Sequence, residues 1–228
     1  PDGRGGGDGP LVLLLHGYGA EPDDLAGVAQ QLPVPDALRF LLLAAPVALP
    51  QGGRAWWPLD LEERRRVLAS KRLRDLSGEV SDGLDDARLK LMTTLRILRE
   101  RPDVREDAIA VVGFSQGAMA ATDLALHAEP RVQAVGILAG TLLAEALWQE
   151  RALHRRGLPT FIAHGESDRL LPFEMARRLE EVLRRGQLDV RFHAHPGGHE
   201  IPGPVLAELA AFLTEVFGTL GDTDAPSP

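Results

Sequence analysis

Short apolar runs alternate along this chain with longer stretches in which apolar residues recur every three or four positions. The short runs have the length of single strands, and they are apolar at successive positions rather than at every second one. This pattern is typical of strands buried on both faces of a mainly parallel sheet. The runs are Leu11–Leu15, Leu38–Ala44, Ala108–Val112, Val132–Leu138 and Thr160–Ala163, with a weaker one at Asp189–Ala194.

The stretches between these runs have a helical period. The longest series consists of Val80, Leu84, Ala87, Leu91, Leu95 and Leu98, and shorter ones lie at Phe173–Leu183 and Val205–Val216. Alternation of strands and helices predicts a three-layer α/β sandwich with a mainly parallel central sheet. No repeat or linker divides the chain. We expect one domain over residues 11–218, with flexible tails rich in Gly, Pro and small polar residues at 1–10 and 219–228.

Composition narrows the function classes. Of 228 residues, 44% are hydrophobic and 25% are charged, which excludes disorder as the main state. The absence of cysteine excludes thiol catalysis and cysteine-based zinc sites. A net charge of -8 disfavours nucleic acid as a partner. No apolar run reaches the ~20 residues of a membrane span. Without a visible targeting signal we expect a cytoplasmic protein, with the mature form of an exported protein left open.

The most specific pattern is Gly113-Phe114-Ser115-Gln116-Gly117, which lies between a predicted strand and a predicted helix. A G-x-S-x-G sequence at such a corner is typical of a nucleophile elbow, in which a strained serine precedes a helix N-terminus. The alternative is a glycine-flanked turn capped by a serine that has no catalytic role. Ser115 is therefore a candidate nucleophile.

A serine nucleophile needs a base, and the base needs an orienting acid. In elbow proteins these follow in the order Ser, acid, His, on loops after later strands. Asp168 and His199 each follow a predicted strand in that order, and we take them as acid and base. Glu166 is the rival acid, and a turn-forming role is the alternative for Asp168.

The other histidines raise a metal alternative. His193 and His195 alternate on a predicted strand, and with His199 they resemble a zinc ligand set. A metal site would leave the G-x-S-x-G pattern unexplained, so we expect no metal and no cofactor.

A serine hydrolase also needs two backbone N–H groups that bind the developing oxyanion. We expect one from Gln116, the residue after the nucleophile, and the other from Tyr18, whose flanking glycines let the chain turn. His16, beside them, is expected to hold this loop through hydrogen bonds.

Trp56 and Trp57 lie in a Pro- and Gly-rich stretch and have two interpretations. They are either core residues or part of a substrate pocket wall. In the second case the wall also includes residues of other strand-end loops: Leu142, Leu143, Leu170 and Ile201.

Five segments, in order, resemble the carboxylesterase/phospholipase family of α/β-hydrolases, which includes small bacterial carboxylesterases and acyl-protein thioesterases. They are LLLHGYGAEPDDL, AAPVALPQGGRAWWPLD, AVVGFSQGAMA, HGESDRLLP and PGGHEIP, and they extend from about Leu11 to Phe217. The resemblance implies an α/β-hydrolase fold, a Ser115–Asp168–His199 triad, Tyr18 and Gln116 as oxyanion donors, and hydrolysis of ester or thioester bonds without a large lid.

The sequence departs from this resemblance at Leu61–Arg74, where six basic residues gather. They are Arg64, Arg65, Arg66, Lys71, Arg72 and Arg74. They form either a solvated helix face or a rim that attracts anionic substrates. The segment from Gly140 to Gly157 also departs, and we expect it to be more helical than the usual loop.

We therefore expect a cofactor-free serine carboxylesterase that acts on small esters of short to medium acyl chain. An acyl thioesterase or lysophospholipase with the same triad is the alternative. From a different class, a non-catalytic binding protein with this fold is the third interpretation. The sequence leaves a homodimer open.

Overall fold

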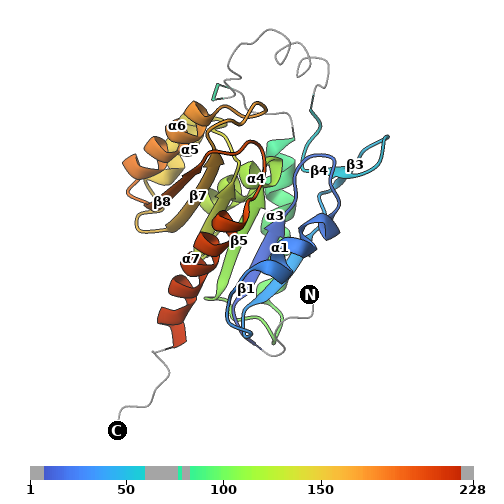
Figure 1. Ribbon diagram of the computed structural model, residues 1–228. Helices are drawn as coiled ribbons and strands as arrows, with labels where there is room; N and C mark the ends of the chain where they lie inside the picture. Colours follow the sequence, from blue (N-terminus) through green and yellow to red (C-terminus); the bar gives the residue numbers. More distant parts are fainter. Residues whose placement is uncertain (1–7, 60–76, 79–82, 222–228) are drawn as a thin grey trace.

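The computed structural model describes residues 8–59, 77–78 and 83–221. Its centre is a six-stranded parallel sheet in the order β2-β1-β5-β6-β7-β8 (Figure 1). Each of the six predicted apolar runs forms one of these strands, with ends that differ by at most two residues. The strands are β1 (Leu11–Leu15), β2 (Arg39–Leu43), β5 (Ile109–Phe114), β6 (Ala134–Leu138), β7 (Pro159–Gly165) and β8 (Asp189–His195).

Helices cover both faces of the sheet, as the alternation in the sequence predicted. One face packs on α1 (Ala26–Gln31) and α7 (Gly203–Gly221), and the other on α3 (Leu84–Arg99), α4 (Gln116–His127), α5 (Glu145–Ala152) and α6 (Phe173–Arg185) (Figure 1). Leu13 contributes to one core and its neighbour Leu14 to the other. Because successive strand residues point to opposite faces, a strand covered on both sides must be apolar throughout.

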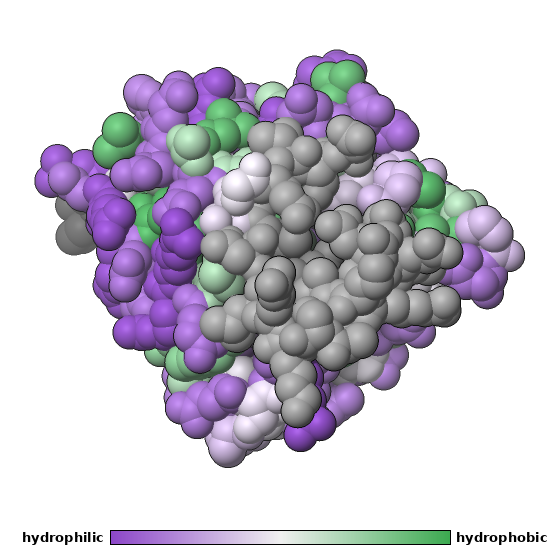
Figure 2. All heavy atoms as spheres, turned by 90° about the horizontal axis from the view of Figure 1, so that it is seen from above, coloured by the Kyte–Doolittle hydropathy of each residue, from purple (hydrophilic) through white to green (hydrophobic). Residues whose placement is uncertain are grey.

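Two short elements complete the described fold. A 3-10 turn, η1 (Pro22–Leu25), precedes α1, and β3 (Val47–Ala48) pairs with β4 (Arg54–Ala55) in an antiparallel hairpin. No helix within the described ranges has the length and hydropathy needed to cross a bilayer. The described surface seen from above is mostly hydrophilic, with apolar side chains in separate small groups (Figure 2).

The predicted tails differ from the structure at both ends. Helix α7 continues to Gly221, past the predicted boundary at 218. Gly9 and Pro10 were predicted to belong to a flexible tail, yet their carbonyl groups accept hydrogen bonds from Arg39 at the start of β2. Val80 and the basic residues of 64–74 lie outside the described residues.

A buried carboxylate joins the three helices α3, α4 and α5. Asp123 on α4 accepts hydrogen bonds from Arg88 on α3 (Nε to Oδ2, 2.5 Å) and from Trp148 on α5 (Nε1 to Oδ1, 2.9 Å). Helix α5 lies in the segment that the sequence predicted to be helical. His127, one turn after Asp123, has Nδ1 2.8 Å from the Asp123 carbonyl oxygen.

His127 is expected to make stability depend on pH. Burial lowers its pKa, against the opposing effect of Asp123 and with a further decrease from Arg88. The native state then binds fewer protons than the unfolded chain, so the free energy of unfolding decreases as pH falls through the ordinary histidine pKa of about 6.5. His127→Gln should make this decrease smaller, measured by urea unfolding at about pH 7.5 and about pH 5.5. The exposed His154→Gln is the control, and equal decreases in both variants would contradict the prediction.

Candidate active site

Ser115 occupies the sharp corner between β5 and α4. Its φ of 57° and ψ of -119° are unusual for a residue with a side chain. A Cβ at Gly113 would collide with the Gly117 carbonyl group, and a Cβ at Gly117 would collide with the carbonyl group of Leu15. Both glycines of the G-x-S-x-G sequence are therefore required by close backbone packing, and Ser115 lies at the N-terminus of a twelve-residue helix.

The structure brings Ser115, His199 and Asp168 into one hydrogen-bonded chain. His199 Nε2 lies 2.8 Å from Ser115 Oγ, and His199 Nδ1 lies 2.7 Å from Asp168 Oδ2. The three residues come from the regions that follow β5, β7 and β8, at one edge of the sheet. With its proton on Nδ1, the imidazole donates to the carboxylate and leaves Nε2 free to accept the serine proton.

Asp168 is held as a carboxylate by hydrogen bonds. Its Oδ1 accepts from the backbone N–H groups of Leu170 (2.8 Å) and Leu171 (2.9 Å). Burial by itself would raise the pKa of Asp168, but the hydrogen bonds from His199 and the two amides outweigh burial and lower it. The rival Glu166 is exposed, and its carboxylate has no hydrogen bond to His199.

Two residues that contact the Ser115–His199–Asp168 series, His164 and Phe114, were missed by the sequence reasoning. His164 is fully buried, with Nε2 2.9 Å from the Leu171 carbonyl oxygen and 3.5 Å from Asp168 Oδ2. Burial lowers the pKa of His164, against the opposing effects of the Leu171 hydrogen bond and of Asp168. The Phe114 ring packs 5.0 Å from that of His199, centre to centre. The one signal for His164 was a polar residue directly after the apolar run Thr160–Ala163.

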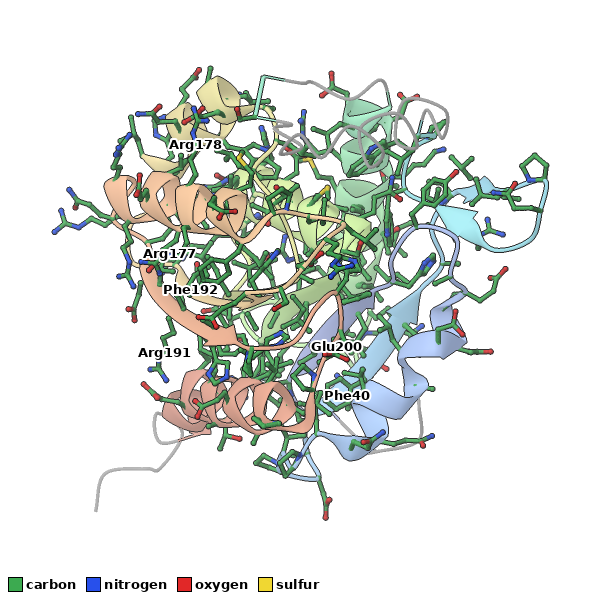
Figure 3. All side chains as sticks on the ribbon, turned by 45° about the horizontal axis from the view of Figure 1, so that its top comes forward. Phe40, Arg177, Arg178, Arg191, Phe192 and Glu200 are labelled. Carbon is green, nitrogen blue, oxygen red and sulfur yellow. The ribbon has the colours of Figure 1, made fainter. Side chains whose placement is uncertain are left out.

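Aromatic packing joins α6, which follows the loop of Asp168, to β8, which precedes the loop of His199. Phe173, at the start of α6, lies 5.8 Å from Phe192 on β8 between ring centres. The Arg177 guanidinium covers the Phe192 ring at 4.7 Å on the outer side of the sheet (Figure 3). Glu200, beside His199, lies on the loop between β8 and α7, where its carboxylate accepts from the Gly198 N–H group at 3.3 Å (Figure 3).

Of the two predicted oxyanion donors, Tyr18 lies on the loop after β1 and Gln116 is the first residue of α4. Neither the backbone N–H group of Tyr18 nor that of Gln116 donates a hydrogen bond within the described part of the chain. Gly17 packs so closely that a Cβ there would lie 3.3 Å from the Ser115 Cβ. The Gln116 side chain is engaged elsewhere: Oε1 accepts from Trp56 N (3.0 Å), and Nε2 donates to Trp57 O (2.8 Å). Only its backbone N–H group is free to meet a substrate.

His16 holds the Tyr18 loop in the way the sequence predicted. Its Nε2 accepts from the Ala45 N–H group at 3.1 Å, and its Nδ1 lies 2.8 Å from the Gly17 carbonyl oxygen. Trp56 Nε1 donates to the His16 carbonyl oxygen at 2.8 Å. These contacts join the loop after β1 to the segments before and after the β3–β4 hairpin.

A cavity of about 430 Å³ opens beside Ser115 and His199. Four of the six predicted wall residues line it, namely Trp57, Leu143, Leu170 and Ile201. Trp56 and Leu142 do not line it, although they are buried in the same core cluster as Trp57 and Leu143. The sequence reasoning missed several other lining residues: Asp24, Leu25, Val28, Leu59, Met119 and Leu171.

The metal alternative finds no support among the residues that the structure describes. No group of three or more His, Asp or Glu side chains there is arranged to hold a metal ion. His199, the third member of the suggested ligand set, is instead hydrogen-bonded to Ser115 and Asp168.

Comparison with known families matches residues 7–217 to the family described as Phospholipase/Carboxylesterase. The chain is 27% identical over 139 residues to the acyl-protein thioesterase 1 of Debaryomyces hansenii, and that match spans 60% of each protein. It is 27% identical over 224 residues to the acyl-protein thioesterase 1 of Mycosarcoma maydis, with 90% of both covered. Among solved structures, esterase PE8 superimposes with a TM-score of 0.77 at 27% identity, covering 93% of this chain and 95% of PE8.

Proposed function

The chain belongs to the phospholipase/carboxylesterase family, and we propose that it hydrolyses small carboxylic esters through an acyl-enzyme on Ser115. The observation that carries this proposal is the hydrogen-bonded chain Asp168–His199–Ser115 beside a largely apolar cavity. An acid, a base and a hydroxyl in this order are the groups that acyl transfer needs. A non-catalytic binding role would require neither these distances nor the strained backbone of Ser115.

In the proposed reaction, Ser115 Oγ attacks the ester carbonyl carbon while His199 Nε2 takes the hydroxyl proton. The Asp168 carboxylate keeps the other proton on Nδ1 and stabilises the imidazolium. His199 then returns its proton to the departing alkoxide. A water molecule then attacks the acyl-enzyme while His199 takes its proton, and His199 passes that proton to Ser115 Oγ as the acid leaves.

The negative oxygen of each tetrahedral intermediate is assigned to the amides of Tyr18 and Gln116. Both backbone N–H groups lack an acceptor within the described residues. Gln116 directly follows Ser115, and Tyr18 follows Gly17, which packs against the Ser115 side chain. Donors already in position require no reorganisation when charge develops. The dipole of α4, whose first residue is Gln116, adds to this effect.

Short to medium acyl chains fit the cavity best. Its volume of about 430 Å³ lies toward the lower end of the range for small-molecule sites, which is about 300 to 1,000 Å³. Eight of the eighteen lining residues are leucine, valine, methionine or isoleucine, and their side chains suit a hydrocarbon chain. The cytoplasmic location and the absence of a nucleic-acid partner stay predictions, and a homodimer stays open.

Acyl thioesters are the second candidate substrates, because two relatives that match this chain carry the name acyl-protein thioesterase 1. The same three residues would catalyse thioester hydrolysis, in which a thiolate leaves more readily than an alkoxide. A lysophospholipase reaction would also use the same steps.

A burst assay tests the proposed chemistry. Mixing the enzyme with p-nitrophenyl butyrate should release a burst of p-nitrophenol, and a fluorophosphonate should label Ser115 and abolish turnover, because both reagents acylate or phosphonylate an activated serine. Esters and thioesters of increasing chain length, assayed in parallel, then rank the substrates. Turnover that is lost on chelation and restored by zinc, with Ser115 unlabelled, would contradict the serine mechanism.

A further inference from the structure

One carboxylate lines the cavity beside Ser115. Among the described lining residues Asp24 is the only one with an acidic side chain, and none is a lysine or an arginine. The remaining lining is apolar or uncharged apart from the two histidines, His16 and His199. The proposed hydrolysis of a neutral ester makes no use of this charge.

The local fold requires an acceptor at Asp24, but it does not require a charge. Asp24 Oδ2 accepts from the Glu21 N–H group at 2.9 Å, which closes the turn at the start of η1. An amide or hydroxyl oxygen accepts such a bond equally well. Asp24 is exposed and has no ion-pair partner in the described chain.

Nearby charges reinforce the negative potential at this side of the cavity. Glu21 and Asp23 lie on the same turn and are both exposed. Arg54 pairs with Ala20 through the backbone, yet its guanidinium donates to the carbonyl oxygens of Ala45 and Pro46 and does not line the cavity.

Two aromatic side chains line the same cavity. Tyr18 and Trp57 both contribute to its wall, together with Leu25 next to Asp24. Aromatic faces attract cations, and their apolar surface packs against the methyl groups of a quaternary ammonium. A carboxylate and aromatic rings around one space are the chemistry that recognises such a group.

We propose that Asp24 makes this site select esters that carry a quaternary ammonium group over neutral isosteres and over anionic esters. The inference rests on the proposed ester hydrolysis and names the substrate class. Asp24 attracts the cation but takes no part in proton transfer, so it sets specificity rather than the chemical step. Because Asp24 is exposed, its attraction is screened by salt over a distance of about 10 Å at 0.1 M.

A pair of matched substrates tests the proposal. Butyrylcholine carries the cation, and 3,3-dimethylbutyl butyrate replaces its nitrogen with carbon at the same shape. The measured quantity is the ratio of their kcat/KM values. In Asp24→Asn, which keeps the side-chain oxygen of the η1 turn, this ratio should fall about 3- to 5-fold, mainly through KM for the choline ester. The fall should shrink as salt is added.

Two further variants separate a local contact from overall charge. Asp23→Asn removes the same charge from a neighbouring residue that does not line the cavity, and the ratio should stay at the wild-type value. Asp24→Glu keeps the charge and should retain the selectivity. A ratio unchanged in Asp24→Asn, or lowered equally in Asp23→Asn, would overturn the proposal.

The same assay keeps this inference apart from the proposed function. Turnover of the neutral ester by the wild-type enzyme, with no effect of Asp24 on the ratio, overturns the charge selectivity alone. Turnover of neither ester contradicts ester hydrolysis and this inference with it. A butyrate ester bearing a carboxylate is the third substrate, and hydrolysis faster than that of the choline ester would also overturn the proposal.

Discussion

Replacing Ser115 with alanine is expected to lower kcat by about 10³- to 10⁶-fold. Among the described residues, Ser115 carries the only hydroxyl hydrogen-bonded to His199. Without it no acyl-enzyme can form, and the remaining rate comes from binding and oxyanion stabilisation. Steady-state hydrolysis of p-nitrophenyl butyrate measures the loss. The fold should persist, because the close packing at this corner involves Gly113 and Gly117 rather than the serine hydroxyl.

Ser167→Ala is the matched control for this variant. Ser167 is exposed on the loop that carries Asp168, and its hydroxyl makes no hydrogen bond within the described residues. It should retain wild-type activity. If Ser115→Ala kept most of its activity while circular dichroism showed a native fold, the proposed mechanism would be wrong.

Asp168→Asn is expected to lower kcat by about 10⁴-fold. Because Oδ1 of Asp168 accepts two backbone N–H groups, an asparagine would place its oxygen there and turn its NH2 group toward His199. Nδ1 of His199 would then have to accept a hydrogen bond, which moves the ring proton to Nε2. An imidazole in that tautomer cannot take the proton of Ser115.

Glu166→Gln is the control for the acid. Glu166 is exposed and lies two residues before Asp168 on the same loop, so its loss of charge matches that of Asp168→Asn. Its kcat should stay within about 3-fold of the wild-type value. A large loss in Glu166→Gln together with a small one in Asp168→Asn would show that the acid had been assigned to the wrong residue.

Much of the fold was predictable from the sequence, because local physics determines it. A strand covered by helices on both faces has no position that favours a polar residue. The sequences of β1, β5 and β6 accordingly contain only apolar residues and glycine. The corner at Ser115 was predictable for a similar reason, since only glycine fits beside the carbonyl groups that approach residues 113 and 117. The order of Ser115, Asp168 and His199 along parallel strands placed all three at one edge of the sheet.

The sequence could not decide which of two adjacent residues faces the cavity. Trp57 and Leu143 line it, whereas their neighbours Trp56 and Leu142 do not, although all four side chains are apolar and buried. The orientation of a loop side chain depends on contacts between distant segments, such as the bonds from the Gln116 side chain to the backbone of Trp56 and Trp57. No local pattern encodes those contacts.

The sequence by itself determined the layers of the fold, the strained serine corner and the order of the three candidate catalytic residues, because each depends on short-range sterics and on the period of apolar positions. Only the tertiary structure decided that His199 lies at hydrogen-bond distance from Asp168 and Ser115, which are 31 and 84 positions away in the sequence. It also decided that His164 lies buried beside Asp168 and that Asp24 borders the cavity. These placements arise from packing between separate loops, and the local sequence does not specify such packing.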